Sequence, residues 1–170
     1  LREERHIRRA CDRAADSYAA LALSARRPPV RALPRSGSYT GPIDFTLQTE
    51  TGALTLSALR GKPVVVYFYP KDDTPGCTRE AIAFSCLKDE FDNIGVTVIG
   101  ISPDSVVRHG KFAQKHELKL RLAADEDHAV AEAYGVWQEK TLYGRTSMGI
   151  VRSTFLIGAD GGIVRAWRKV

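Results

Sequence analysis

The sequence predicts an α/β fold in which a central mixed sheet is flanked by helices. Two continuous apolar runs, VVVYFY at 64–69 and VTVIGIS at 96–102, have the length and composition of buried strands. A helical pattern from Cys77 to Asp92 lies between them. Near the end of the chain, two short apolar segments flank a Gly-rich turn at 159–162, which predicts a terminal hairpin.

The other elements follow from local patterns along the chain. Residues 43–59 alternate around a central Thr-Gly pair, which predicts a first hairpin. Asp104 is the expected N-cap of a helix that runs to about His116. The segments LKLRLAAD and DHAVAEAYG predict a short strand and then a short helix closed by Gly135.

Length and charge limit the class of protein. The 170 residues suffice for one domain with a substantial core, and no apolar run approaches the roughly 18 residues of a membrane-spanning helix. Residues 1–40 hold nine arginines and four acidic residues, whereas residues 41–170 hold 16 basic and 16 acidic ones. The net charge of +5 therefore belongs to the N-terminal segment. The remaining body offers no electrostatic case for nucleic-acid binding.

Residues 1–42 are expected to be an Arg-rich extension, disordered or atypical, that precedes a domain at 43–170. The Pro- and Gly-rich stretch at 26–42 favours an irregular linker. The apolar segment at 19–25 is too weak for a secretory signal, and the four acidic residues argue against a transit peptide. A targeting or nucleic-acid-binding arm is the alternative. We expect a cytoplasmic protein.

The strongest chemical signal is the stretch YPKDDTPGCTREAIAFSC at 69–86. A buried strand ends there, a rigid turn at Pro70 follows, and a helix begins close to Cys77. A cysteine in the first turn of a helix faces unpaired backbone amides and the positive end of the helix dipole, and both favour the nucleophilic thiolate. Thr74 can donate a hydrogen bond to that thiolate or to a bound substrate. The alternative is an ordinary capped helix with a cysteine near its start.

The frame Pro-x-x-x-Thr-x-x-Cys, formed here by Pro70, Thr74 and Cys77, resembles the signature of peroxiredoxins. The strings FYPKDDTPGCTREA, YGVWQEKTLYGRTSMGI and VRSTFLIG resemble the bacterioferritin-comigratory-protein or PrxQ subfamily over about residues 43–170. The resemblance implies a thioredoxin-like fold and a thiol peroxidase that reduces hydrogen peroxide and organic hydroperoxides. It also implies that Cys77 is the peroxidatic cysteine, that Thr74 and Arg152 activate the peroxide, and that Pro70 shields the site.

Two charged residues can also be interpreted without the resemblance. Arg152 begins an apolar strand, so a neighbouring strand could carry it to the sheet edge at which Cys77 lies. Its fork of donors suits developing negative charge. The alternative is a surface arginine at a strand end. Glu80, three residues after Cys77, could orient Arg152, or it could be a first-turn acid favoured by the helix dipole.

Cys86 is the candidate resolving cysteine. In a continuous helix it lies about 13 Å along the axis from Cys77 and on the opposite side, whereas a disulfide needs Cα atoms within about 7 Å. Subfamily members often carry the second cysteine at the position of Ile82, or on the next helix, where this chain offers only Ser105. We favour resolution by thioredoxin or another external thiol. Cys86 of the same chain, after the helix melts, and Cys86 of a second chain are the alternatives.

No cofactor or metal is expected, because His109 and His116 are two turns apart and no Cys/His cluster has ligand spacing. The family usually continues into a final helix, so we expect that helix to be lacking and the chain to be a fragment. A monomer or weak dimer is expected. Two other function classes stay open. One is a thiol–disulfide oxidoreductase, although residue 80 is Glu where Cys-x-x-Cys needs a second cysteine. The other is a non-catalytic thioredoxin-like binding module.

Overall fold

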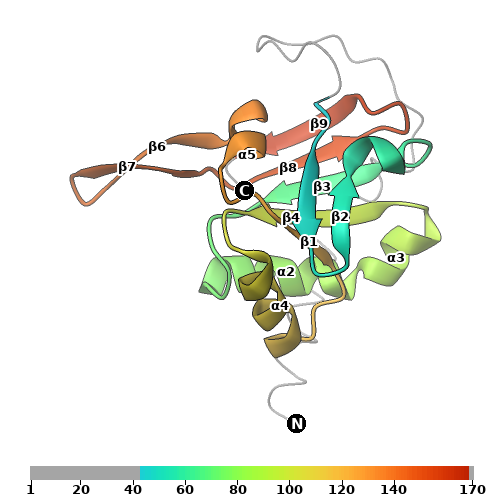
Figure 1. Ribbon diagram of the computed structural model, residues 1–170, viewed down its shortest axis with the longest axis horizontal. Helices are drawn as coiled ribbons and strands as arrows, with labels where there is room; N and C mark the ends of the chain where they lie inside the picture. Colours follow the sequence, from blue (N-terminus) through green and yellow to red (C-terminus); the bar gives the residue numbers. More distant parts are fainter. Residues whose placement is uncertain (1–42, 169–170) are drawn as a thin grey trace.

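The computed structural model describes residues 43–168, so the Arg-rich segment at 1–42 lies outside the described residues. A seven-stranded mixed sheet forms the centre of the fold (Figure 1). This arrangement confirms the predicted fold class. In sheet order the strands are β2 (Gly52–Thr55), β1 (Thr46–Thr49), β5 (Arg121–Ala124), β4 (Thr97–Ser102), β3 (Val64–Phe68), β8 (Ser153–Ile157) and β9 (Ile163–Arg168).

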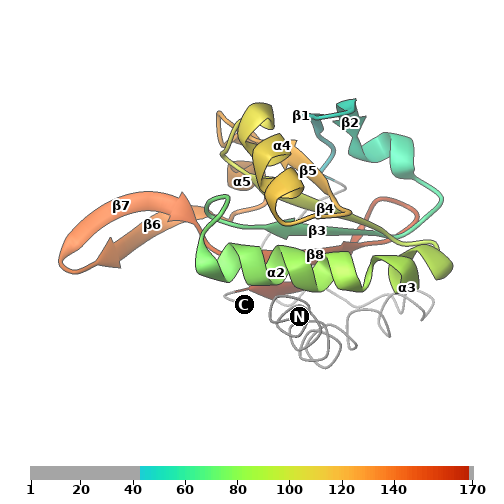
Figure 2. The same cartoon turned by 90° about the horizontal axis from the view of Figure 1, so that it is seen from below.

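Helices cover both faces of the sheet. One core cluster holds side chains of α2 (Pro75–Cys86), α3 (Lys88–Asn93) and α4 (Val106–Lys115). The other holds side chains of α5 (Ala129–Ala133) and the short 3₁₀ helix η1 (Leu56–Leu59). Figure 2 shows α2 and α3 following one another along one side of the sheet. In the described part of the chain no helix is long and apolar enough to cross a membrane.

The helix predicted from Cys77 to Asp92 is two helices in the structure. Leu87 separates them with a ψ of 2°, and its amide donates to the carbonyl oxygens of both Ala83 and Ser85. The break comes without Gly or Pro, so the sequence carries no signal for it.

Strand β3 lies between β4 and β8, and all of its residues are buried. Val64, Val66 and Phe68 belong to the core cluster that includes α5, whereas Val65 and Tyr67 belong to the cluster that includes α2. Burial on both faces explains why this strand has a continuous apolar sequence and no polar alternation.

The pairing of β3 brings three parts of the chain to one edge of the sheet. It runs parallel to β4, with Phe68 opposite Ile101, and antiparallel to β8, with Phe68 opposite Ser153. The end of β3 therefore lies beside the end of β4 and the beginning of β8. Cys77, which follows β3 in the chain, and Arg152, which directly precedes β8, contact each other at this edge.

The N-terminal boundary of α4 differs from the prediction. Ser105 is the N-cap, and its hydroxyl accepts a hydrogen bond from the Arg108 amide at 3.4 Å. The Asp104 carboxylate accepts instead from the Asp72 amide at 2.7 Å and from the Ser102 hydroxyl at 3.1 Å. Either residue suits an N-cap, so the contact with the loop after β3 decides between them.

Strands β6 (Trp137–Leu142) and β7 (Arg145–Ile150) form a separate hairpin that projects from the body of the molecule (Figures 1 and 2). Its turn residues, Tyr143 and Gly144, both have positive φ, as a two-residue type I′ turn requires. The sequence pattern does not predict this hairpin, because most of its side chains face solvent and lack apolar alternation.

The remaining predicted elements are present. The two strands of the first hairpin pair around Glu50 and Thr51, one residue earlier than the predicted centre. Helix α5 ends before Gly135, which has a φ of 66°. The predicted terminal hairpin is formed by β8 and β9, and β9 is the last described element.

Candidate active site

Cys77 is the third residue of α2, behind an N-cap at Thr74 and a proline at the first helical position. Its thiol is free and buried, and it packs in the apolar cluster with Ala81 and Phe84. Backbone amides of a first helical turn have no partner within the helix, and they carry the positive end of its dipole. Burial keeps water away from the sulfur, and the sulfur lies beside this helix end.

Arg152 joins Cys77 to a buried acid. Its Nη2 donates to the Cys77 sulfur at 3.0 Å, and its Nη1 donates to Oε2 of Glu80. The Glu80 side chain is 4% exposed and that of Arg152 is 20% exposed. Burial works against the charge of Arg152, but the Glu80 carboxylate and Cys77 raise the pKa of Arg152 above its ordinary value. The guanidinium therefore stays charged beside the thiol.

The other residues of the predicted motif lie in the loop and helix start before Cys77. The Thr74 hydroxyl donates to the Lys71 carbonyl oxygen at 3.0 Å. The only proton of the Thr74 hydroxyl is used in this hydrogen bond, so the hydroxyl oxygen can accept a hydrogen bond from a substrate O–H. The sequence predicts that Thr74 donates a hydrogen bond instead. Pro70 is exposed. A Cβ at Gly76 would lie 3.4 Å from Nη2 of Arg152, so glycine leaves room for the guanidinium.

Lys140 in β6 is a second cation near the site. Its ammonium donates to the Ile150 carbonyl oxygen, two residues before Arg152. Burial lowers the pKa of Lys140, as does the charge of Arg152, and the Cys77 sulfur partly opposes this. The sequence alone does not single out Lys140. Its one signal is its place in the string YGVWQEKTLYGRTSMGI.

Cys86 lies at the far end of α2, nine residues from Cys77, and is half-buried. Cys77 is a free thiol in the structure. The two sulfurs are therefore not bonded to each other, and a continuous helix separates them. In the part of the chain that the structure describes, no three His, Cys, Asp or Glu side chains are grouped to hold a metal ion.

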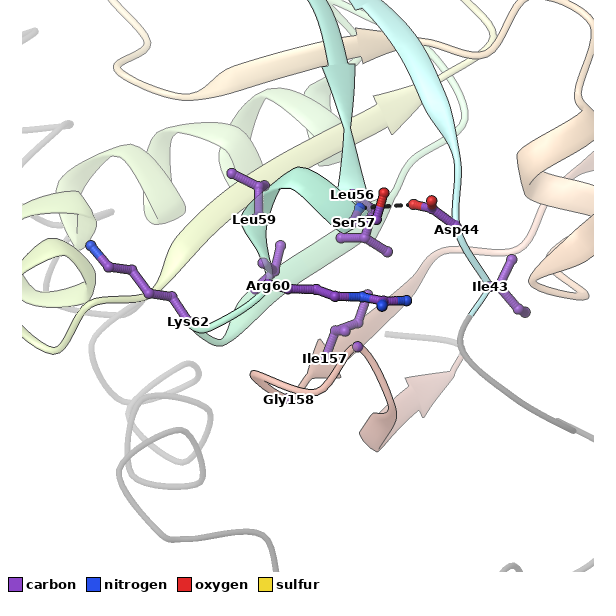
Figure 3. Close-up of a pocket in the computed structure, with 11 residues that line it drawn as sticks. Ile43, Asp44, Leu56, Ser57, Leu59, Arg60, Lys62, Ile157 and Gly158 are labelled. Atoms are coloured by element: carbon purple, nitrogen blue, oxygen red, sulfur yellow. Dashed lines mark hydrogen bonds between the residues drawn. The ribbon is translucent and has the colours of Figure 1, made fainter.

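A recess far from Cys77 lies at the beginning of β3, whereas Cys77 lies beyond the end of that strand (Figure 3). Leu56 and Ile157 are among its apolar lining, and Asp44 accepts a hydrogen bond from the Ser57 amide at 2.8 Å. The hydrogen bond from the Ser57 side chain lowers the pKa of Asp44. The recess shares no lining residue with the Cys77–Arg152–Glu80 group.

Comparison with known proteins identifies the family. A match to the AhpC/TSA family spans residues 42–166. The chain is a peroxiredoxin of the AhpC/TSA family. It is 47% identical to the peroxiredoxin Bcp of Bacillus subtilis over 128 residues, which cover 75% of this chain and 82% of that protein. It is 46% identical to the peroxiredoxin Bcp of Escherichia coli K12 over 120 residues, covering 70% and 77% respectively.

Solved structures agree with this family. The bacterioferritin comigratory protein of Xanthomonas campestris, described for its alkyl peroxide reduction activity, has 44% identity and a TM-score of 0.71, covering 74% of this chain and 81% of that one. BcpB of Mycobacterium tuberculosis has 36% identity and a TM-score of 0.66, covering 75% and 82%. The predicted Bcp or PrxQ subfamily, the thioredoxin-like fold and the thiol peroxidase class are therefore confirmed.

Proposed function

We propose that this peroxiredoxin reduces hydrogen peroxide and alkyl hydroperoxides through a sulfenic acid at Cys77. The observation that carries the proposal is the hydrogen bond of 3.0 Å from Arg152 to the buried Cys77 sulfur at the start of α2. A charged donor at this position favours the thiolate, and it lies where the peroxide oxygens must approach the sulfur. The alkyl peroxide activity described for the X. campestris relative supports the same substrate class here.

In the proposed reaction the Cys77 thiolate attacks one peroxide oxygen. An S–O bond forms, the O–O bond breaks, and the second oxygen leaves as alkoxide or hydroxide. That leaving group becomes alcohol or water by taking the proton of the attacked oxygen or one from solvent. The sulfur loses two electrons and becomes a sulfenic acid, while the peroxide gains them.

The other motif residues have distinct roles in this proposal. Arg152 stabilises the negative charge that develops on the peroxide oxygens, and Glu80 holds the guanidinium in place. Thr74 accepts a hydrogen bond from the peroxide O–H, because its own proton is on the Lys71 carbonyl. Pro70 lies at the solvent side of the loop and limits the access of water.

We further propose that an external thiol, from thioredoxin or a small molecule, resolves the sulfenic acid. The thiol attacks the sulfenic sulfur, water leaves, and a second thiol reduces the mixed disulfide. Cys86 is the alternative, in the same chain after α2 melts or in a second chain of a dimer. It lies at the other end of the helix from Cys77.

The assignment of Cys77 is tested by serine substitution. Cys77→Ser should abolish peroxide consumption driven by a thiol reductant while circular dichroism shows an unchanged fold. Cys86→Ser, in the same helix, is the matched control and should keep the rate of the first oxidation step. Wild-type turnover in Cys77→Ser would overturn the assignment.

The resolving step is tested by mass after fully reduced protein reacts with one equivalent of peroxide. External resolution predicts a monomer heavier by one oxygen atom, trapped by a sulfenic-acid reagent and unchanged in Cys86→Ser. A disulfide mapped to Cys77 and Cys86 within one chain would show that Cys86 resolves. The same disulfide in a covalent dimer would show that a second chain supplies it.

A further inference from the structure

A buried polar cluster lies beside the loop that carries Thr74. It consists of Tyr69, Asp72 and His109, with exposed fractions of 1%, 3% and 0%. Tyr69 and Asp72 belong to the segment after β3, whereas His109 comes from α4. The reaction steps proposed above use none of these three side chains.

The hydrogen bonds of the cluster join its three side chains. The Tyr69 hydroxyl donates to one Asp72 carboxylate oxygen at 2.7 Å, and Nδ1 of His109 lies 2.8 Å from the other. Nε2 of His109 lies 3.2 Å from the Ala123 carbonyl oxygen in β5. Because Nδ1 faces a carboxylate oxygen, it is the ring nitrogen that donates to Asp72. Burial, together with nearby charge, raises the pKa of Tyr69, so its hydroxyl keeps the proton that it donates.

The backbone of Asp72 is held as well. Its amide donates to Oδ2 of Asp104 at 2.7 Å, and Oδ1 of Asp104 pairs with Nε of Arg108 at 3.1 Å. Asp104 follows β4, His109 lies in α4, and Ala123 lies in β5. Asp72, two residues before Thr74, thus contacts Asp104 and His109 directly, and His109 connects it to β5.

Burying charged and polar groups costs desolvation energy, and well-packed apolar replacements of buried ion pairs are often as stable or more stable. What a hydrogen-bonded pair adds is direction, because each hydrogen bond fixes the position of a particular atom. The carboxylate that both Tyr69 and His109 contact belongs to Asp72, in the loop between Pro70 and Thr74.

We propose that His109 is a positioning residue for the peroxide reaction. Through its hydrogen bond at Nδ1 it holds the Asp72 carboxylate, and through Asp72 it sets the loop so that the Thr74 hydroxyl and the Cys77 thiolate converge on the peroxide. The inference rests on the proposed function of this site.

The experiment compares His109→Gln and Asp72→Asn, each of which replaces one partner of the contact but keeps polar atoms, with the double variant. His116→Gln is the matched control, because His116 lies beside the same helix and contacts the same loop at Asp73, but on the surface. Two rates are measured for Cys77. One is the second-order reaction with hydrogen peroxide, and the other is alkylation by iodoacetamide at a pH at which the thiol is fully ionised.

The two single variants should each slow the peroxide reaction by roughly 10- to 10²-fold, the range expected when a reacting group is displaced by about 1 Å. Alkylation should be unchanged, because it needs the thiolate but not the Thr74 hydroxyl. The double variant should be no slower than the slower single variant, because both act through one contact. The His116→Gln control should match wild type in both rates.

Three results would overturn the proposal. They are an unchanged peroxide rate in either single variant, equal losses in both reactions, and additive losses in the double variant. If His109→Gln does not fold, Asp72→Asn tests the same contact alone. Nitrogen chemical shifts of His109 provide a separate readout, and an Nδ1 atom without a proton would also contradict the hydrogen bond to Asp72. Wild-type turnover in Cys77→Ser would contradict the proposed function itself. Failure of the His109 proposal and failure of the proposed function are therefore distinguishable.

Discussion

Substitution of Arg152 should damage rate and stability for different reasons. Arg152→Met removes the donor to Cys77 while keeping an apolar side chain of similar length. Loss of one preorganised donor typically slows a reaction by roughly 10²–10³-fold. The same change leaves the Glu80 carboxylate buried without the guanidinium that now neutralises it.

The cost to stability follows from the loss of the guanidinium beside that buried carboxylate. Removing one partner of a buried ion pair typically costs about 3–5 kcal/mol of unfolding free energy. The Arg152 side chain is 20% exposed, so water can reach the Glu80 carboxylate when the guanidinium is removed. We therefore expect a loss near the lower limit, about 3 kcal/mol.

A double variant separates the two effects. Arg152→Met with Glu80→Gln removes the buried charge and should recover most of the lost unfolding free energy in urea denaturation. It should not recover the peroxide rate, measured by stopped-flow oxidation of reduced protein, because no cation faces the Cys77 sulfur. A peroxide rate near wild type in Arg152→Met, or a double variant as unstable as the single one, would refute the reasoning.

Three further predictions concern single residues. Thr74→Val should slow peroxide reduction by roughly 10²–10³-fold, with iodoacetamide alkylation of the thiolate unchanged, and an unaltered peroxide rate would remove Thr74 from the mechanism. Hydrogen bonds led by that of His116 lower the pKa of Asp73 below its ordinary value of 3.8. The ionised Asp73 carboxylate therefore stabilises the folded protein at pH values above the ordinary pKa. This stability is lost as the pH falls through the lowered pKa of the folded state. Asp73→Asn should flatten the loss of stability below about pH 4 in acid titration, and an identical titration curve would contradict this. Gly100→Ala should lower the unfolding free energy by about 1–3 kcal/mol, because its Cβ would lie 2.6 Å from the buried Tyr67 oxygen. Wild-type stability in urea would show that Tyr67 can move.

The buried strands and the site around Cys77 could be predicted from sequence because their causes are local. A strand buried on both faces needs an unbroken apolar run, as 64–69 has. The environment of Cys77 depends on the turn and helix start that immediately precede it. Both patterns lie within one short stretch of chain.

Tertiary structure decided the contacts that join distant residues. Arg152 is 75 positions from Cys77, and only the antiparallel register of β8 on β3 brings its guanidinium to the sulfur. Asp104 suits an N-cap on local grounds, yet it binds the Asp72 amide 32 positions away. His109 reads locally as one more residue of α4. The proposed role of His109 depends on its contacts with Asp72 and Ala123, which belong to other parts of the chain. Such contacts follow from packing and strand register, and a local sequence pattern does not record them.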